Sequence, residues 1–119
     1  MKILCGIRDI EKALEDYRTE FERIHGISLK NGTLLCSIGE SKYKASEIAQ
    51  KISVRFSKCS KMIQDAEQKG LIQRTIGTED KRNMYFTLTS KGKKQLEHIC
   101  SNKIELPEIL ASGLTSKQI

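Results

Sequence analysis

A regular stripe of apolar residues at the start of the chain constrains its fold most. Seven apolar residues are spaced alternately four and three positions apart: Ile3, Ile7, Ile10, Leu14, Tyr17, Phe21 and Ile24. This is the repeat of a helix that packs along a narrow seam against other helices. Gly26 is expected to end the helix. The stripe predicts a dimerisation helix, and the alternative is a helix that only covers the core of its own domain.

Charge is distributed unevenly along the 119 residues. The chain holds 21 Lys and Arg and 15 Asp and Glu, for a net charge of +6. Residues 41–94 hold thirteen basic and five acidic side chains, whereas the segments on either side are each slightly acidic. A basic centre favours an anionic partner, with nucleic acid as the first candidate. The alternative is a basic surface that is merely solvated.

Several protein classes do not fit the sequence. No apolar stretch approaches the roughly 18 residues of a membrane span, and a signal peptide is not recognisable at the N-terminus, so we expect a cytoplasmic protein with no membrane partner. Motifs of nucleotide-binding and hydrolytic enzymes are missing, which predicts that the chain is not an enzyme and uses no cofactor.

The four cysteines lack the close spacing of a zinc site, so we expect no bound metal. Cys36, Cys59 and Cys100 fall at apolar positions of helical patterns and are predicted to be core residues. Cys5 is then the one candidate for an oxidation switch.

The remaining pattern predicts a mostly α (α+β) protein with one domain over 1–119. Helices are expected at about 28–38, 44–52 and 56–69, strands at 71–76 and 83–88, and a further helix from residue 90. Ser28 and Thr89 are candidate N-caps, and Gly70 is a candidate helix end. A last amphipathic helix could lie within 104–114. The expected organisation is an N-terminal dimerisation helix (1–26), a winged helix-turn-helix core (28–90) and C-terminal helices (90–119).

Two short helices followed by a hairpin with a basic tip form the pattern of a winged helix-turn-helix. The polar side of the 56–69 helix could enter the major groove of duplex DNA, and the hairpin tip could enter the minor groove. The candidate DNA-binding residues are Arg55, Ser57, Lys58, Ser60, Lys61, Gln64, Lys81, Arg82 and Asn83. The alternatives are an ordinary surface helix and turn, or a winged helix that binds another protein.

Two segments resemble the MarR-type transcriptional regulators. Residues 46–74 are similar to the helix-turn-helix of that family. Asp80-Lys81-Arg82, followed by Leu88-Thr89 and Gly92, resembles its wing signature. The match covers about residues 28–100.

The resemblance implies a homodimer that binds a pseudo-palindromic DNA operator and regulates transcription, most often as a repressor. It implies that the 56–69 helix is the recognition helix, that Arg82 enters the minor groove and that Asp80 orients the wing tip. It also implies a small aromatic effector that binds between the dimer body and the winged lobe.

Overall fold

The structure is a computed structural model that describes residues 2–77 and 82–114. The described helices and strands follow one another in the order α1 (Lys2–His25), α2 (Leu29–Ile38), α3 (Ala45–Lys51), α4 (Phe56–Gln68), β1 (Ile72–Ile76), β2 (Met84–Leu88), α5 (Ser90–Ser101) and α6 (Glu108–Ala111). The chain divides into two compact units. One is the continuous segment Leu29–Asn102, and the other combines Met1–Ser28 with Lys103–Ile119. The predicted mostly helical fold with a two-stranded hairpin is confirmed.

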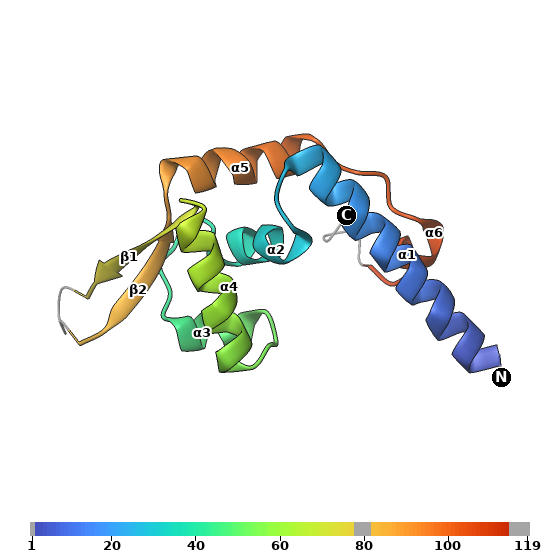
Figure 1. The fold of residues 1–119 in the computed structure, drawn as a ribbon, viewed down its shortest axis with the longest axis horizontal. Coiled ribbons are helices and arrows are strands. Elements are labelled where there is room, and N and C mark those ends of the chain that lie inside the picture. The colour runs from blue at the N-terminus through green and yellow to red at the C-terminus, as the bar shows by residue number, and fades with distance from the viewer. Residues whose placement is uncertain (1, 78–81, 115–119) are drawn as a thin grey trace. The chain divides into compact units, whose positions relative to one another are not determined.

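A helix-turn-helix formed by α3 and α4 makes up the end of the Leu29–Asn102 unit opposite α5 (Figure 1). Between α3 and α4 the chain turns within four residues, and Ser53 adopts a left-handed backbone with φ of 56°. The N–H of Val54 donates to the carbonyl of Ala49 at 3.0 Å, which closes the turn. The core beneath the turn is formed by three helices through Leu34, Leu35, Ile38, Ile48, Ala49, Cys59, Ile63 and Ala66. Apolar residues at helical spacing therefore fix the inner face of α4 and leave its other side to solvent.

A two-stranded antiparallel wing follows α4. Strand β1 pairs with β2 in a register that joins Ile72 to Leu88 and Ile76 to Met84. Tyr43, in the loop before α3, forms an isolated bridge with Phe86: the Phe86 N–H donates to the Tyr43 carbonyl at 2.8 Å. The bridge attaches the loop before α3 to the outer edge of β2, so the wing and the helix-turn-helix share backbone hydrogen bonds.

The start of α5 explains why the sequence reads Leu-Thr and then Gly at this point. The Thr89 hydroxyl accepts a hydrogen bond from the Gly92 N–H at 3.0 Å, which confirms the predicted N-cap. A side-chain carbon at Gly92 would lie 2.1 Å from the carbonyl oxygen of Leu71. Only glycine fits there, because the first turn of α5 presses directly on the backbone that enters β1.

The other unit contains α1 and α6. Gly26 follows α1 with a φ of 73°, so the predicted helix end is confirmed. The predicted amphipathic helix within 104–114 is much shorter in the structure, because α6 covers only Glu108–Ala111. Pro107 precedes it as the N-cap, and its ring prevents a helix from running through from 104. Among the described residues, no helix is long and apolar enough to cross a bilayer.

Candidate nucleic-acid interface

The outer face of α4 is polar and basic. Cys59, Ile63 and Ala66 bury the inner face. Five of the predicted DNA-binding residues are exposed on or next to this helix: Arg55, Ser57, Lys58, Lys61 and Gln64. Arg55 is the N-cap residue and has extended backbone. A helix with one buried side and one exposed side rich in short polar and basic residues has the form needed to approach the edges of bases.

Ser60 differs from the other residues predicted on α4. It is half-buried, and it lines a groove of about 280 Å³ between α4, α3 and the wing. The other residues that line the groove are Ala45, Ile63, Glu67, Arg74, Met84 and Phe86. We predicted Ser60 on the exposed side of the helix, but the wing covers part of that side and leaves Ser60 only half-exposed.

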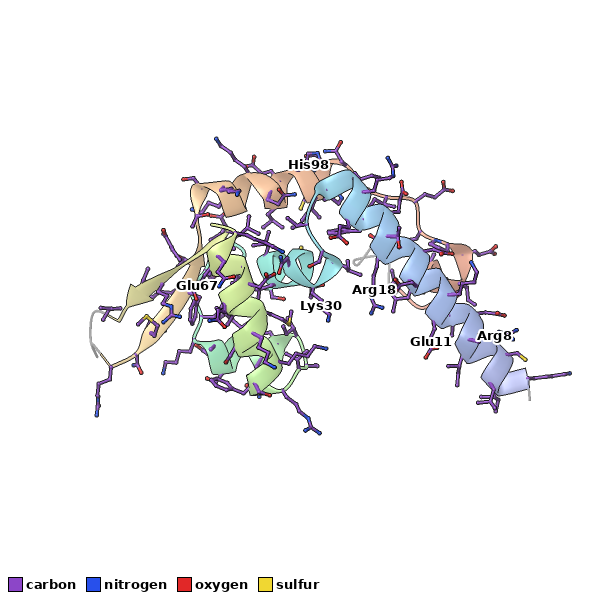
Figure 2. The ribbon with its side chains drawn as sticks, viewed as in Figure 1. Arg8, Glu11, Arg18, Lys30, Glu67 and His98 are labelled. Carbon is purple, nitrogen blue, oxygen red and sulfur yellow. The ribbon has the colours of Figure 1, made fainter. Side chains whose placement is uncertain are left out.

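A bidentate ion pair joins the wing to α4. Arg74 on β1 donates to Glu67 through Nε at 2.8 Å and through a terminal nitrogen at 3.1 Å. Glu67 lies on the side of α4 that faces the two strands (Figure 2). The guanidinium of Arg74 also lies 5.8 Å from the ring centroid of Phe86. Two parallel hydrogen bonds favour one relative orientation of the two side chains, so this pair links the wing to α4 in addition to the backbone hydrogen bonds.

The wing tip is described only in part. Lys81 and Asp80 lie outside the described residues. Arg82 is exposed, and Asn83 is half-buried, with its carbonyl accepting a hydrogen bond from the Gly77 N–H at 2.9 Å. Arg82 therefore lies just before β2, outside the paired residues of the hairpin.

A second basic surface, which the sequence analysis missed, lies where α3 meets the wing. The ammonium groups of Lys42 and Lys44 lie 4.9 and 5.9 Å from the ring centroid of Tyr85. Lys51 lies 4.2 Å from the ring centroid of Tyr43 and donates to its hydroxyl at 3.0 Å. This hydrogen bond lowers the pKa of Tyr43. These five residues are called the lysine–tyrosine cluster below. Its parts come together through the bridge between Tyr43 and β2, a non-local pairing that local sequence patterns do not reveal.

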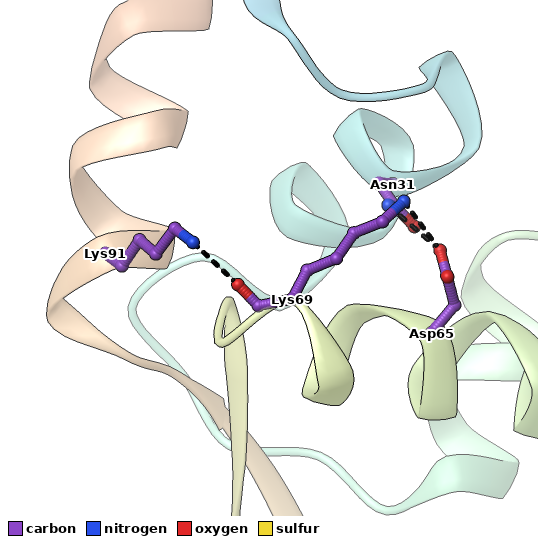
Figure 3. A network of polar contacts seen from close by, with 4 residues as sticks. All are labelled: Asn31, Asp65, Lys69 and Lys91. Atoms are coloured by element: carbon purple, nitrogen blue, oxygen red, sulfur yellow. Dashed lines mark hydrogen bonds and ion pairs between the residues drawn. The ribbon is translucent and has the colours of Figure 1, made fainter.

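A polar network holds the opposite end of α4 against two other helices (Figure 3). The buried amide of Asn31 on α2 donates to Asp65 at 3.2 Å, and Lys69 donates to the same carboxylate at 3.0 Å. These hydrogen bonds, led by that of Lys69, lower the pKa of Asp65. Lys91 on α5 donates to the carbonyl of Lys69 at 2.8 Å. The network ties the end of α4 to α2 and α5, so it fixes the direction in which the helix points.

The predicted dimerisation stripe is only partly covered within one chain. Ile3, Ile7 and Ile10 are 77, 47 and 45% exposed, and Ile24 is 36% exposed. Leu14 and Tyr17 are half-buried. Phe21 is buried and packs edge-to-face on His25, with ring centroids 4.6 Å apart. The N-terminal half of α1 thus presents a row of uncovered isoleucines.

The cysteine prediction is confirmed for only one residue. Cys59 is buried, but Cys36 and Cys100 are exposed, as is Cys5. The prediction fails because an apolar position on a helix is buried only where another element covers that side, and the described elements leave Cys36 and Cys100 accessible. Partial burial still raises the pKa of Cys36. Within the described residues, no group of three metal-ligating side chains exists.

Comparison with known proteins relates the sequence of the chain to a bacterial transcriptional repressor. No family model matches the chain. Over 76 residues the chain is 33% identical to the HTH-type transcriptional repressor MdtR of Bacillus subtilis (strain 168), a match that covers 64% of this chain and 49% of MdtR. The chain therefore spans about half the length of the curated relative that it matches.

Two solved structures illustrate the shared fold. A mutant of Escherichia coli MarR, complexed with operator DNA, superposes with a TM-score of 0.70 at 22% identity over 81% of this chain and 71% of MarR. A MepR-like protein complexed with pseudoligands gives a TM-score of 0.78 at 23% identity over 98% and 83% of the two chains. The chain has the winged helix-turn-helix fold of these proteins, and its resemblance to the MarR-type transcriptional regulators is confirmed.

Proposed function

We propose that this protein is a sequence-specific, double-stranded DNA-binding transcriptional regulator that acts as a homodimeric repressor. The observation that carries the proposal is the exposed face of α4, which holds Lys58, Lys61 and Gln64 beside a wing that carries Arg82. In this arrangement α4 enters the major groove and the wing reaches the neighbouring minor groove. MarR bound to operator DNA and the repressor MdtR support it by likeness. No enzymatic role is proposed.

The lysine–tyrosine cluster extends this surface along the DNA backbone. Its ammonium groups lie against aromatic rings, which restricts the lysine side chains before any partner binds. Phosphates that flank the recognition helix are the partners that fit such groups. The cluster therefore supplies affinity for any duplex, whereas α4 supplies sequence preference.

A second copy of the chain is the partner that we propose for α1. Ile3, Ile7 and Ile10 have about half or more of their surface in water. Burying each of them fully in an interface would stabilise the dimer by up to roughly 1.5–3 kcal/mol. We expect Ile7→Glu combined with Ile10→Glu to give monomers in sedimentation, because two charges would enter the seam. Glu11→Lys, on the charged side of α1, is the matched control and should remain dimeric. If the double variant also stays dimeric, α1 is not the interface.

The DNA-binding proposal is tested by selecting duplexes from a random pool and titrating the best one at several salt concentrations. Lys58→Ala or Lys61→Ala should lower the slope of log affinity against log salt by about one unit. Lys94→Ala on α5 is the control, because α5 lies on the far side of its unit from α3 and should change nothing (Figure 1). A wild-type protein that binds no duplex even at low salt would favour a protein-interaction module instead.

The wing contact is tested separately. Arg82→Ala should cost on the order of 1–3 kcal/mol on the selected duplex, and more where the flanks are A·T-rich, since a narrow minor groove attracts a guanidinium. Arg82→Lys should restore only part of the loss, because an ammonium lacks the planar fork. Equal losses on A·T-rich and G·C-rich flanks would assign Arg82 to phosphate contact only.

The proposal includes a small aromatic effector that weakens DNA binding. A MepR-like protein of similar fold, complexed with pseudoligands, supports a ligand site by likeness. A small aromatic acid such as benzoate should lower duplex affinity in a concentration-dependent way, whereas an aliphatic acid of equal charge should not. Identical behaviour of both acids would indicate an ionic-strength effect without a site.

A further inference from the structure

One large apolar side chain on α4 is left in water. Phe56, the first residue of the helix, is 59% exposed. The other apolar residues of α4 behave differently: Cys59, Ile63 and Ala66 are buried, and Met62 is half-buried. The core therefore includes the apolar face of α4 from Cys59 onward and leaves the Phe56 ring largely uncovered.

The surroundings of Phe56 are polar and positively charged. Arg55 precedes it, and Ser57 and Lys58 follow it; all three are exposed. An apolar surface of another protein would have to desolvate these groups in order to cover the ring, at a cost that the ring alone would not offset. A polyanion that also carries an apolar group at the right place satisfies both parts of this surface.

Duplex DNA offers one such group. The N-terminal residues of a recognition helix contact base edges in the major groove. The only apolar group that a base edge presents there is the C5-methyl group of thymine, and phenylalanine is among the side chains suited to it. The phosphates that border the groove are the natural partners of Arg55 and Lys58.

We propose that Phe56 is a specificity-determining residue that contacts the methyl group of a thymine in each half-site. This inference rests on the proposed function, because it requires α4 to enter the major groove. It adds a readout that the polar residues of α4 do not provide, since serine, lysine and glutamine make hydrogen bonds. The expected recognition sequence therefore contains one thymine per half-site whose methyl group, and not only its hydrogen-bonding edge, is required.

The experiment removes the methyl group from the DNA without altering the protein. In the selected duplex, each thymine is replaced in turn by uracil, which keeps base pairing and hydrogen-bonding groups. Burial of one methyl group corresponds to about a fourfold change in affinity. At one position per half-site, wild-type affinity should fall by about fourfold, whereas Phe56→Ala should bind the thymine and uracil duplexes equally.

Two further variants distinguish loss of the methyl contact from a general loss of DNA affinity. Phe56→Leu retains an apolar side chain and should keep part of the preference for thymine. Lys61→Ala should lose the same factor of affinity on both duplexes and therefore retain the full preference. If no position distinguishes wild type from Phe56→Ala, the inference is overturned while the proposed function stands. If wild type binds no duplex at all, both are overturned.

Discussion

The close approach between α5 and the start of β1 makes Gly92→Ala the most informative single substitution for the fold. The added carbon would lie 2.1 Å from the Leu71 carbonyl oxygen, where ordinary contact begins at 3.4 Å. This oxygen cannot simply move aside, because it also accepts a hydrogen bond from the Thr89 N–H at 3.0 Å. The carbonyl carbon of Leu71 would also lie too close, at 3.1 Å.

The magnitude follows from two opposing effects. An added carbon in a packed site typically lowers the free energy of unfolding by about 1–3 kcal/mol. The loss for Gly92→Ala should lie at the upper end, because the group that it meets is the backbone of Leu71. The higher helix propensity of alanine raises the free energy of unfolding by at most about 1 kcal/mol. The free energy of unfolding should then fall by about 2 kcal/mol. For a unit of the length of Leu29–Asn102, this corresponds to a fall in Tm of roughly 8–16 °C.

Thermal and urea unfolding followed by far-ultraviolet circular dichroism would measure the loss. Gly6→Ala is the matched control, because apart from the neighbouring backbone of α1 no described heavy atom lies within 4 Å of the carbon that it would add. It should leave stability unchanged or raise it by up to about 1 kcal/mol. A Gly92→Ala protein as stable as wild type would refute the argument from the Leu71 contact.

Three further outcomes are expected. The pKa of Asp65 is lowered because Lys69 and a neighbouring amide donate hydrogen bonds to its carboxylate. The ionised carboxylate therefore stabilises the fold fully above about pH 4, and this stabilisation is lost as the pH falls through the lowered pKa. The urea midpoint of Asp65→Asn should accordingly vary less with pH in this acidic range than the midpoint of wild type. Ser53→Gly should stabilise the turn after α3 by up to about 1 kcal/mol in the same unfolding assay, since glycine accepts a φ of 56° at little steric cost, and a destabilised variant would contradict this. In thiol labelling of the native protein, Cys59 should stay unmodified until the chain unfolds, whereas Cys36 should react, and faster as the pH rises towards its raised pKa.

Local patterns in the sequence were sufficient to predict most of the fold. The stripe from Ile3 to Ile24 predicts α1 almost to its ends, and Gly26 and Gly70 stop their helices with left-handed backbone. Strand pairing in the wing follows from two apolar segments that flank a polar turn. These features depend on residues close together in the chain, where periodicity and turn chemistry decide the structure.

Features that depend on distant residues could not be predicted in the same way. Cys36 and Cys100 lie in apolar patterns, but burial depends on whether another element covers that side of the helix. The half-buried position of Ser60 results from the wing, which lines the same groove and is linked to α4 by the Glu67–Arg74 pair. Sequence alone made no prediction for Phe56, whose 59% exposure appears only in the structure.

The division of the chain into units has a consequence for the order in which the protein folds during synthesis. Leu29–Asn102 is continuous, so this unit can fold as soon as it has been synthesised, in the way that domains generally do. The other unit joins Met1–Ser28 to residues that follow position 102, so α1 gains its partners within the chain only after the Leu29–Asn102 unit has been synthesised. Ile3, Ile7 and Ile10 stay 77, 47 and 45% exposed even in the complete fold, so in the proposed homodimer the isoleucine row is covered only after synthesis, when the chain meets its second copy.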